Sequence, residues 1–147
     1  MATERKAEVV WEGNLLDGSG TIVSNTSGAL PQLAVSWPSR AEEPEGKTSP
    51  EELIAAAHAA CYAMALSGTI GRKNAKARWL HVTATVGAEF GETGLKILSS
   101  RLHVVAEGLE GLTAAQFSDV AKEAEGRCPV SNALRASLKI DVEAQVK

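Results

Sequence analysis

Cys61 and Cys128 are the two side chains with the clearest chemical potential in this sequence. The sequence contains no nucleophile elbow around a serine, no glycine loop that would cradle phosphate and no Cys-x-x-Cys pair. Its three histidines and two cysteines are widely separated, so a metal site would have to be assembled by tertiary structure, and we expect none. Of these kinds of chemistry only that of the thiols remains as a candidate function. The alternative is that both cysteines are buried and inert.

Helix position alone favours Cys128 as the more reactive thiol. Cys128 followed by Pro129 is typical of an N-cap and N1 pair, and Arg127 precedes them. The positive end of the helix macrodipole and the arginine both favour a thiolate. The alternative is that Cys128 is a small buried hydrophobe at a tight helix start.

Cys61 is predicted in the middle of a helix, where burial raises the pKa of a thiol and no dipole lowers it. It therefore needs a nearby cation to become a nucleophile. His58, three residues earlier, is one candidate, although a histidine on a helix face is more often a packing residue.

The helix that carries Cys61 has a clear start. Ser49 is expected as its N-cap, Pro50 at N1, and Glu52 at N3 completes a capping box. We expect the helix to run to about Thr69 and to end at Gly71. One face is apolar and rich in small residues, which permits close helix packing; it comprises Ile54, Ala57, Cys61, Met64, Ala65 and Gly68.

Alternating apolar and polar residues predict strands on both sides of this helix. Before it we expect strands at 6–12 and 21–24 joined by a turn at 17–20, a less regular strand at 30–37, and an exposed loop at 38–49. After it we expect a hairpin of strands 80–90 and 98–106, a helix from the Thr113/Gln116 capping box to Gly126, the helix headed by Cys128, and a last strand at 138–146. This order predicts an α+β fold in which antiparallel sheet packs on helices.

Length and composition favour one compact domain over residues 1–147. The sequence is 44% hydrophobic and 22% charged, and its formal charge of −3 provides no basic surface for nucleic acid. The longest apolar stretch, residues 54–66, is shorter than the roughly 20 residues of a membrane span. No hydrophobic signal region follows the charged N-terminus, so we expect a cytoplasmic protein with no membrane or nucleic-acid partner.

Two segments of this sequence resemble the cysteine motifs of the OsmC/Ohr family. They are TSPEELIAAAHAACYAMAL at residues 48–66 and CPVSNAL at residues 128–134. The early Trp11-Glu12-Gly13 and the order of elements are also similar to that family, so the resemblance extends over essentially the whole chain. Within the family the chain is more similar to the OsmC branch than to the organic hydroperoxide resistance branch, because an arginine precedes the helix and His58 lies in the motif.

This resemblance implies a thiol peroxidase that reduces hydroperoxides, organic ones preferentially, in oxidative or osmotic stress. It implies that Cys61 is the peroxidatic thiol, which becomes a sulfenic acid, and that Cys128 is the resolving thiol, which closes a Cys61–Cys128 disulfide. These roles reverse the ranking that helix position gives. By the same resemblance Arg40 stabilises the thiolate and Glu51 orients Arg40, while an external dithiol such as a lipoyl group is the reductant and no metal or bound cofactor is needed.

The spacing of Glu51 and Cys61 carries a geometric consequence. Ten residues along a helix separate two side chains by about 15 Å in rise and about 80° in rotation, so the two cannot meet on one peroxide within one subunit. The resemblance implies an intertwined homodimer whose sheets wrap central helices, with the active site at the subunit interface. Two other functions stay open: a stress protein that binds an apolar ligand in the same cavity, and a redox sensor whose disulfide changes a partner interface.

Overall fold

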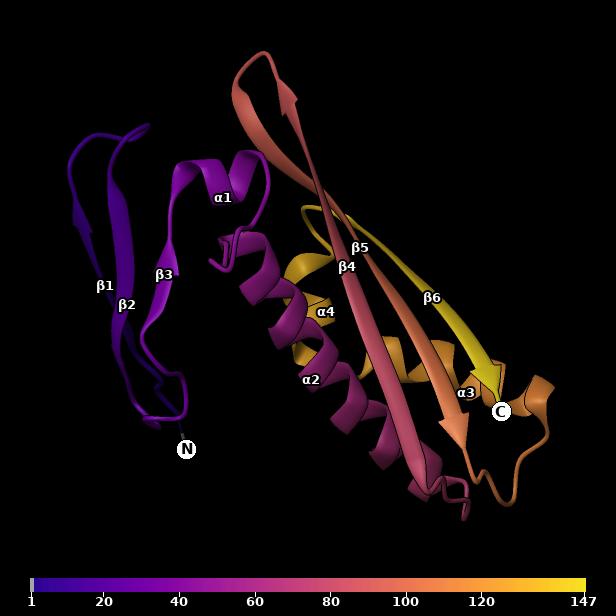
Figure 1. Ribbon diagram of the computed structural model, residues 1–147. Coiled ribbons are helices and arrows are strands. Elements are labelled where there is room, and N and C mark those ends of the chain that lie inside the picture. Colours follow the sequence, from indigo (N-terminus) through magenta and orange to yellow (C-terminus); the bar gives the residue numbers. More distant parts are fainter. Residues whose placement is uncertain (1) are drawn as a thin grey trace. The chain divides into compact units, whose positions relative to one another are not determined.

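The computed structural model describes residues 2–147, which divide into two compact units, one reaching to Leu53 and the other formed by Ile54–Lys147. The first unit contains three strands, β1 (Ala7–Glu12), β2 (Ser19–Asn25) and β3 (Leu33–Val35), and a short helix α1 (Trp37–Ala41) (Figure 1). The strands form an antiparallel sheet in the order β1-β2-β3. The single domain expected over residues 1–147 stays a prediction.

Two features of the first unit differ from the sequence-based expectation. Strand β1 is exposed along its whole length, so its alternation does not bury one side within this chain. The expected loop at 38–49 begins inside helix α1, which takes up its residues as far as Ala41. The helix starts here because Ser36 and Ser39 form a reciprocal capping box and Pro38 lies in the first turn. Near the end of that segment the Thr48 N–H donates to the Ala34 carbonyl of β3 at 3.0 Å.

The second unit is built on a sheet in the order β4-β5-β6. Its elements are most of helix α2 (Pro50–Arg72), strands β4 (Trp79–Gly91) and β5 (Gly94–Glu107), helices α3 (Ala114–Gly126) and α4 (Pro129–Leu134), and strand β6 (Lys139–Val146). Strands β4 and β5 form the expected antiparallel hairpin, but β6 lies parallel to β5. The expectation of antiparallel sheet was wrong for β6, because α3 and α4 supply the long crossover that parallel strands need.

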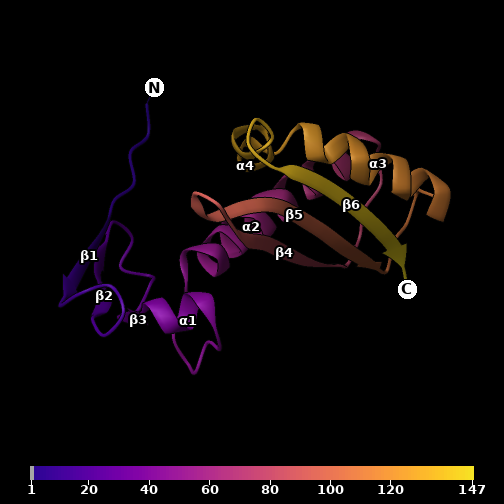
Figure 2. The same ribbon diagram turned by 90° about the horizontal axis from the view of Figure 1, so that it is seen from above.

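The core of the second unit lies between one face of this sheet and the helices α2 and α3. Alternate residues of β5, among them Leu102 and Val104, pack with Tyr62 and Leu66 of α2 and with Phe117 of α3. Figure 2 shows α3 lying along β6. This packing fixes α2, which carries Cys61, against the sheet. Helix α4, which begins after Cys128, follows directly on α3.

Helix α2 packs on the sheet of its own chain through a face other than its small-residue face. Its buried residues are His58, Tyr62, Leu66, Thr69 and Ile70. On the small-residue face, Met64 is 71% exposed and Gly68 is exposed. The helix is apolar nearly all round, so the larger side chains, rather than the period of the pattern, decide which face packs on the sheet.

By length and composition alone, helix α2 could cross a membrane, but core helices of soluble proteins meet the same two criteria. Only 28% of its most apolar 18-residue window is buried within the chain. The expectation that this helix is not a membrane span stays a prediction.

Candidate active site

Cys61 and Cys128 lie together in the second unit, with their Sγ atoms 3.1 Å apart and both present as thiols. Cys61 projects from the middle of α2 and is half-buried, whereas Cys128 is fully buried as the N-cap of α4. The expected N-cap geometry is confirmed, with Pro129 at N1 and the Ser131 N–H donating to Cys128 Sγ at 3.4 Å. A disulfide needs about 2.05 Å between sulfurs, so a small approach would join the pair.

Burial raises the pKa of the Cys61 thiol, and the neighbouring Cys128 adds to the increase. A hydrogen bond from the Val130 backbone N–H, in the first turn of α4, acts in the opposite direction. The thiolate is thus disfavoured by its own surroundings, in agreement with the expectation that Cys61 needs a cation.

Arg40 and Glu51 form a two-point ion pair in the first unit. Arg40 Nε lies 3.0 Å from Glu51 Oε1 and 3.3 Å from Oε2, and Nη2 lies 2.8 Å from Oε1. Glu51 is 13% exposed and Arg40 31% exposed. This arrangement fixes the plane of the guanidinium while leaving part of it accessible, which a freely rotating lysine would not achieve.

Residues beside this ion pair are joined by hydrogen bonds of their own, which connect α1 to the start of α2. Ser39 of α1 donates its hydroxyl to the carbonyls of Ser36, at 2.9 Å, and of Thr48, at 3.3 Å. The Thr48 hydroxyl donates in turn to Glu52 Oε1 at 2.7 Å. Ser49 caps α2 as expected by accepting from the Glu52 N–H, but the second half of the expected capping box was wrong because the Glu52 side chain bonds Thr48.

The four predicted site residues therefore form two pairs, Cys61 with Cys128 in the second unit and Arg40 with Glu51 in the first. The roles of the four residues in a reaction stay predictions.

His58 is a buried packing residue rather than a partner of Cys61. Both ring nitrogens bond serine hydroxyls, Nδ1 that of Ser100 at 2.7 Å and Nε2 that of Ser131 at 2.7 Å. Burial lowers the pKa of His58 despite the opposing charge of Glu125, so the ring is neutral at pH 7. Sequence reasoning missed the two serines, since they lie 42 and 73 residues after His58 and no local pattern connects residues so far apart.

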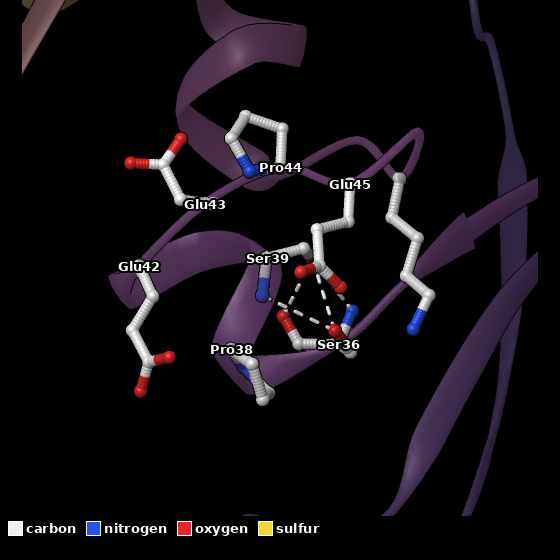
Figure 3. A pocket seen from close by; sticks show the side chains of 8 residues that line it. Ser36, Pro38, Ser39, Glu42, Glu43, Pro44 and Glu45 are labelled. Atoms are coloured by element: carbon white, nitrogen blue, oxygen red, sulfur yellow. Dashed lines mark hydrogen bonds between the residues drawn. The ribbon is translucent and has the colours of Figure 1, made fainter.

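A cavity of about 140 Å³ in the first unit lies beside α1 and contains neither cysteine (Figure 3). Its lining residues are Ser36, Pro38, Ser39, Glu42, Glu43, Pro44, Glu45 and Lys47. The two serine hydroxyls bond each other at 3.1 Å, and Figure 3 shows the side chains of Glu42 and Glu43 directed away from them. Among residues 2–147 no group of three or more His, Cys, Asp or Glu side chains is arranged to hold a metal ion.

Fold and site together define an α+β protein with a close cysteine pair, one thiol on a core helix and the other at the N-cap of a short helix. The sequence matches the OsmC-like protein family over residues 43–143. It is 36% identical to peroxiredoxin OsmC of Escherichia coli K12 over 143 residues, which are 97% of this chain and 98% of that protein. It is 30% identical to the organic hydroperoxide resistance protein OhrA of Bacillus subtilis over 126 residues, covering 84% and 86% of the two chains.

Solved structures agree with this fold. The organic hydroperoxide resistance protein OhrB of Bacillus subtilis superposes with a TM-score of 0.71 at 26% identity, covering 95% of this chain and 97% of that one. An OsmC-like protein of Mycoplasma pneumoniae reaches a TM-score of 0.74 at 17% identity, covering 99% of each chain, and supports the fold alone. The chain belongs to the OsmC/Ohr family, as the two cysteine motifs predicted.

Proposed function

We propose that this protein is a cysteine-based peroxidase that reduces hydroperoxides, organic ones preferentially, to alcohols. The observation that carries the proposal is the 3.1 Å separation of Cys61 Sγ and Cys128 Sγ. The names of the relatives from Escherichia coli and Bacillus subtilis support the same chemistry. A reducing compartment, which we propose to be the cytoplasm, would return the pair to the thiol state after each turnover.

The proposed cycle has three steps. The Cys61 thiolate attacks the distal oxygen of the hydroperoxide, the O–O bond breaks, and a proton completes the alcohol while Cys61 becomes a sulfenic acid. The Cys128 sulfur then displaces the hydroxyl of the sulfenic acid, so that a Cys61–Cys128 disulfide forms and water leaves. An external dithiol, proposed to be a lipoyl group or a small thiol, reduces this disulfide by exchange and is itself oxidised.

Arg40 is the proposed cation that offsets the raised pKa of Cys61, and Glu51 is proposed to hold it in place. Glu51 and Cys61 both belong to α2, along which ten residues span about 15 Å. We therefore propose an intertwined homodimer in which Arg40 and Glu51 of one subunit complete the site around Cys61 of the other. The exposed small-residue face of α2, with Met64 71% exposed, supports a second copy as the partner that covers it.

Peroxide consumption by three proteins tests the chemistry: the wild type, Cys61→Ser and Cys128→Ser, each with tert-butyl hydroperoxide, cumene hydroperoxide or hydrogen peroxide and a dithiol. We expect fast turnover of the organic peroxides by the wild type, its complete loss in Cys61→Ser, and a trapped Cys61 sulfenic acid in Cys128→Ser. Equal, slow rates in all three proteins would contradict the peroxidase and favour a protein that only binds an apolar ligand. Fast disulfide formation without turnover by any dithiol would instead favour a redox sensor.

Mixed dimers test the shared site. If Arg40 acts across the interface, a dimer of one Cys61→Ser chain and one Arg40→Ala chain keeps one complete site, so random mixing of two inactive proteins should restore roughly a quarter of wild-type activity. Mixing Cys61→Ser with Cys128→Ser chains is the matched control, since both sulfurs of a pair lie in one chain and no complete site can form. An absence of recovery in the first mixture, once mixed dimers are verified by mass, would place Arg40 and Cys61 of one chain in the same site.

A further inference from the structure

His58 joins three elements of the second unit through its two ring nitrogens. The ring lies on α2, Ser100 on β5 and Ser131 on α4, and all three residues are 0% exposed. Both nitrogen-to-oxygen distances are 2.7 Å. A fully buried polar group of this kind is costly to desolvate unless each polar atom has a partner, and the two serines supply a partner for each ring nitrogen.

Ser131 connects the two cysteine-bearing elements. Its hydroxyl bonds His58, which lies three residues before Cys61 on α2, and its backbone N–H donates to Cys128 Sγ at 3.4 Å. Helix α4 has six residues, too few to be stable by itself, so contacts with the rest of the unit must hold it. Ser131 is the buried residue within that helix, at its N3 position.

We propose that His58 and Ser131 form a positioning pair that holds Cys128 within reach of Cys61 and so sets the rate of disulfide closure. This inference rests on the proposed peroxidase cycle. The step concerned joins the Cys61 sulfenic acid and the Cys128 thiol into a disulfide with loss of water. When closure is slow, a second hydroperoxide oxidises the sulfenic acid to a sulfinic acid and leaves as the alcohol, which inactivates the protein.

Ser100 offers a matched control within the same network. Ser131→Ala and Ser100→Ala each remove one hydroxyl from the same histidine at the same distance and the same burial. The two changes therefore cost similar stability, but only Ser131→Ala removes a hydrogen bond between α4 and α2. An effect confined to Ser131→Ala separates positioning of Cys128 from a general loss of packing.

Single-turnover experiments with cumene hydroperoxide and rapid quenching resolve the two steps by mass spectrometry. We expect Ser131→Ala to slow disulfide closure roughly tenfold, the ratio that one buried hydrogen bond supports, and to raise the sulfinic acid formed per turnover by a similar factor. The rate of sulfenic acid formation should stay within about threefold of wild type in both variants, and Ser100→Ala should close its disulfide nearly as fast as wild type. Equal slowing of closure by the two variants, or by neither, would overturn the proposal.

Two further measurements keep the proposal testable if Ser131→Ala does not fold or if the wild type consumes no peroxide. Ser131→Thr and Ser131→Val have the same shape and differ in the hydroxyl, so fast closure in the threonine variant alone supports the hydrogen bond even where Ser131→Ala does not fold. Equilibration with reduced and oxidised glutathione measures the effective concentration of Cys128 at Cys61 without any peroxide. A fall confined to Ser131→Ala supports the positioning pair even if the wild type consumes no peroxide, an outcome that would reject the proposed function alone.

Discussion

Replacing Glu51 with glutamine tests whether the Arg40 ion pair supports the attack of Cys61 on peroxide. The carboxylate accepts three contacts from the guanidinium, between 2.8 and 3.3 Å. Glutamine keeps one acceptor oxygen but loses the charge and turns an amide N–H₂ toward the cation. Charge-assisted hydrogen bonds are each worth about 1.5–3 kcal/mol, and solvent around the partly exposed Arg40 screens some of this. A loss of about 1.4–2.7 kcal/mol corresponds to a decrease of about 10- to 100-fold in kcat/KM for an organic hydroperoxide.

Glu52→Gln is the matched control for this change. Glu52 neighbours Glu51 in the first turn of α2 and accepts from the Thr48 hydroxyl, not from Arg40. Either substitution removes one negative charge from the same helix N-terminus, so the helix-dipole contribution of about 0.3–1 kcal/mol is lost in both. The assay is the second-order rate of cumene hydroperoxide reduction at saturating dithiol, where we expect Glu52→Gln to stay within about threefold of wild type. Equal rates for the two variants would refute a role for the Arg40–Glu51 pair.

Three other substitutions have outcomes that follow from burial and charge. In a Cys128→Ser background, Arg40→Gln should raise the pH midpoint of Cys61 alkylation by iodoacetamide, because the cation that offsets the raised pKa of Cys61 is lost. Identical midpoints with and without Arg40 would rule out Arg40 as the activating cation. Burial lowers the pKa of His58, with Glu125 opposing, so the unfolded chain binds more protons than the folded chain below about pH 6.5. As the pH falls through this range, the stability of the wild type to urea should therefore decrease more steeply than that of His58→Gln. Parallel pH profiles of the two proteins would contradict this. Tyr62→Phe removes the 2.8 Å bond to the Ala121 carbonyl, which should cost about 1 kcal/mol and lower Tm by about 2–4 °C; an unchanged calorimetric Tm would refute that value.

Local sequence signals predicted the helix starts that position the site. Ser49 and Pro50 begin α2, Thr113 and Gln116 form a reciprocal capping box before α3, and Cys128 caps α4. Each of these signals depends on residues within one turn, so no tertiary information is needed to interpret it. This is why the pattern placed Cys61 on a helix and Cys128 at a helix start.

Tertiary context decided the features that sequence reasoning missed. The parallel pairing of β6 with β5 depends on how the chain crosses the sheet, and the buried face of α2 depends on which large side chains the sheet accepts. The His58 network joins residues from three distant segments, and its serines have no motif of their own. These three features are contacts made across the fold, which a local periodicity does not encode.

The difference in exposure of the two cysteines reconciles the two rankings of their reactivity. Helix position predicts Cys128 as the more reactive thiol, but Cys128 is 0% exposed, so a bulky hydroperoxide has no direct path to its sulfur. Cys61 is half-buried and accessible in part, yet its pKa is raised by its surroundings. A thiol that is reachable but needs a cation suits the first step, where Arg40 is proposed to supply the charge. A thiol that is enclosed but lies 3.1 Å from Cys61 suits the second step, because the sulfur that becomes oxidised in the first step lies directly beside it.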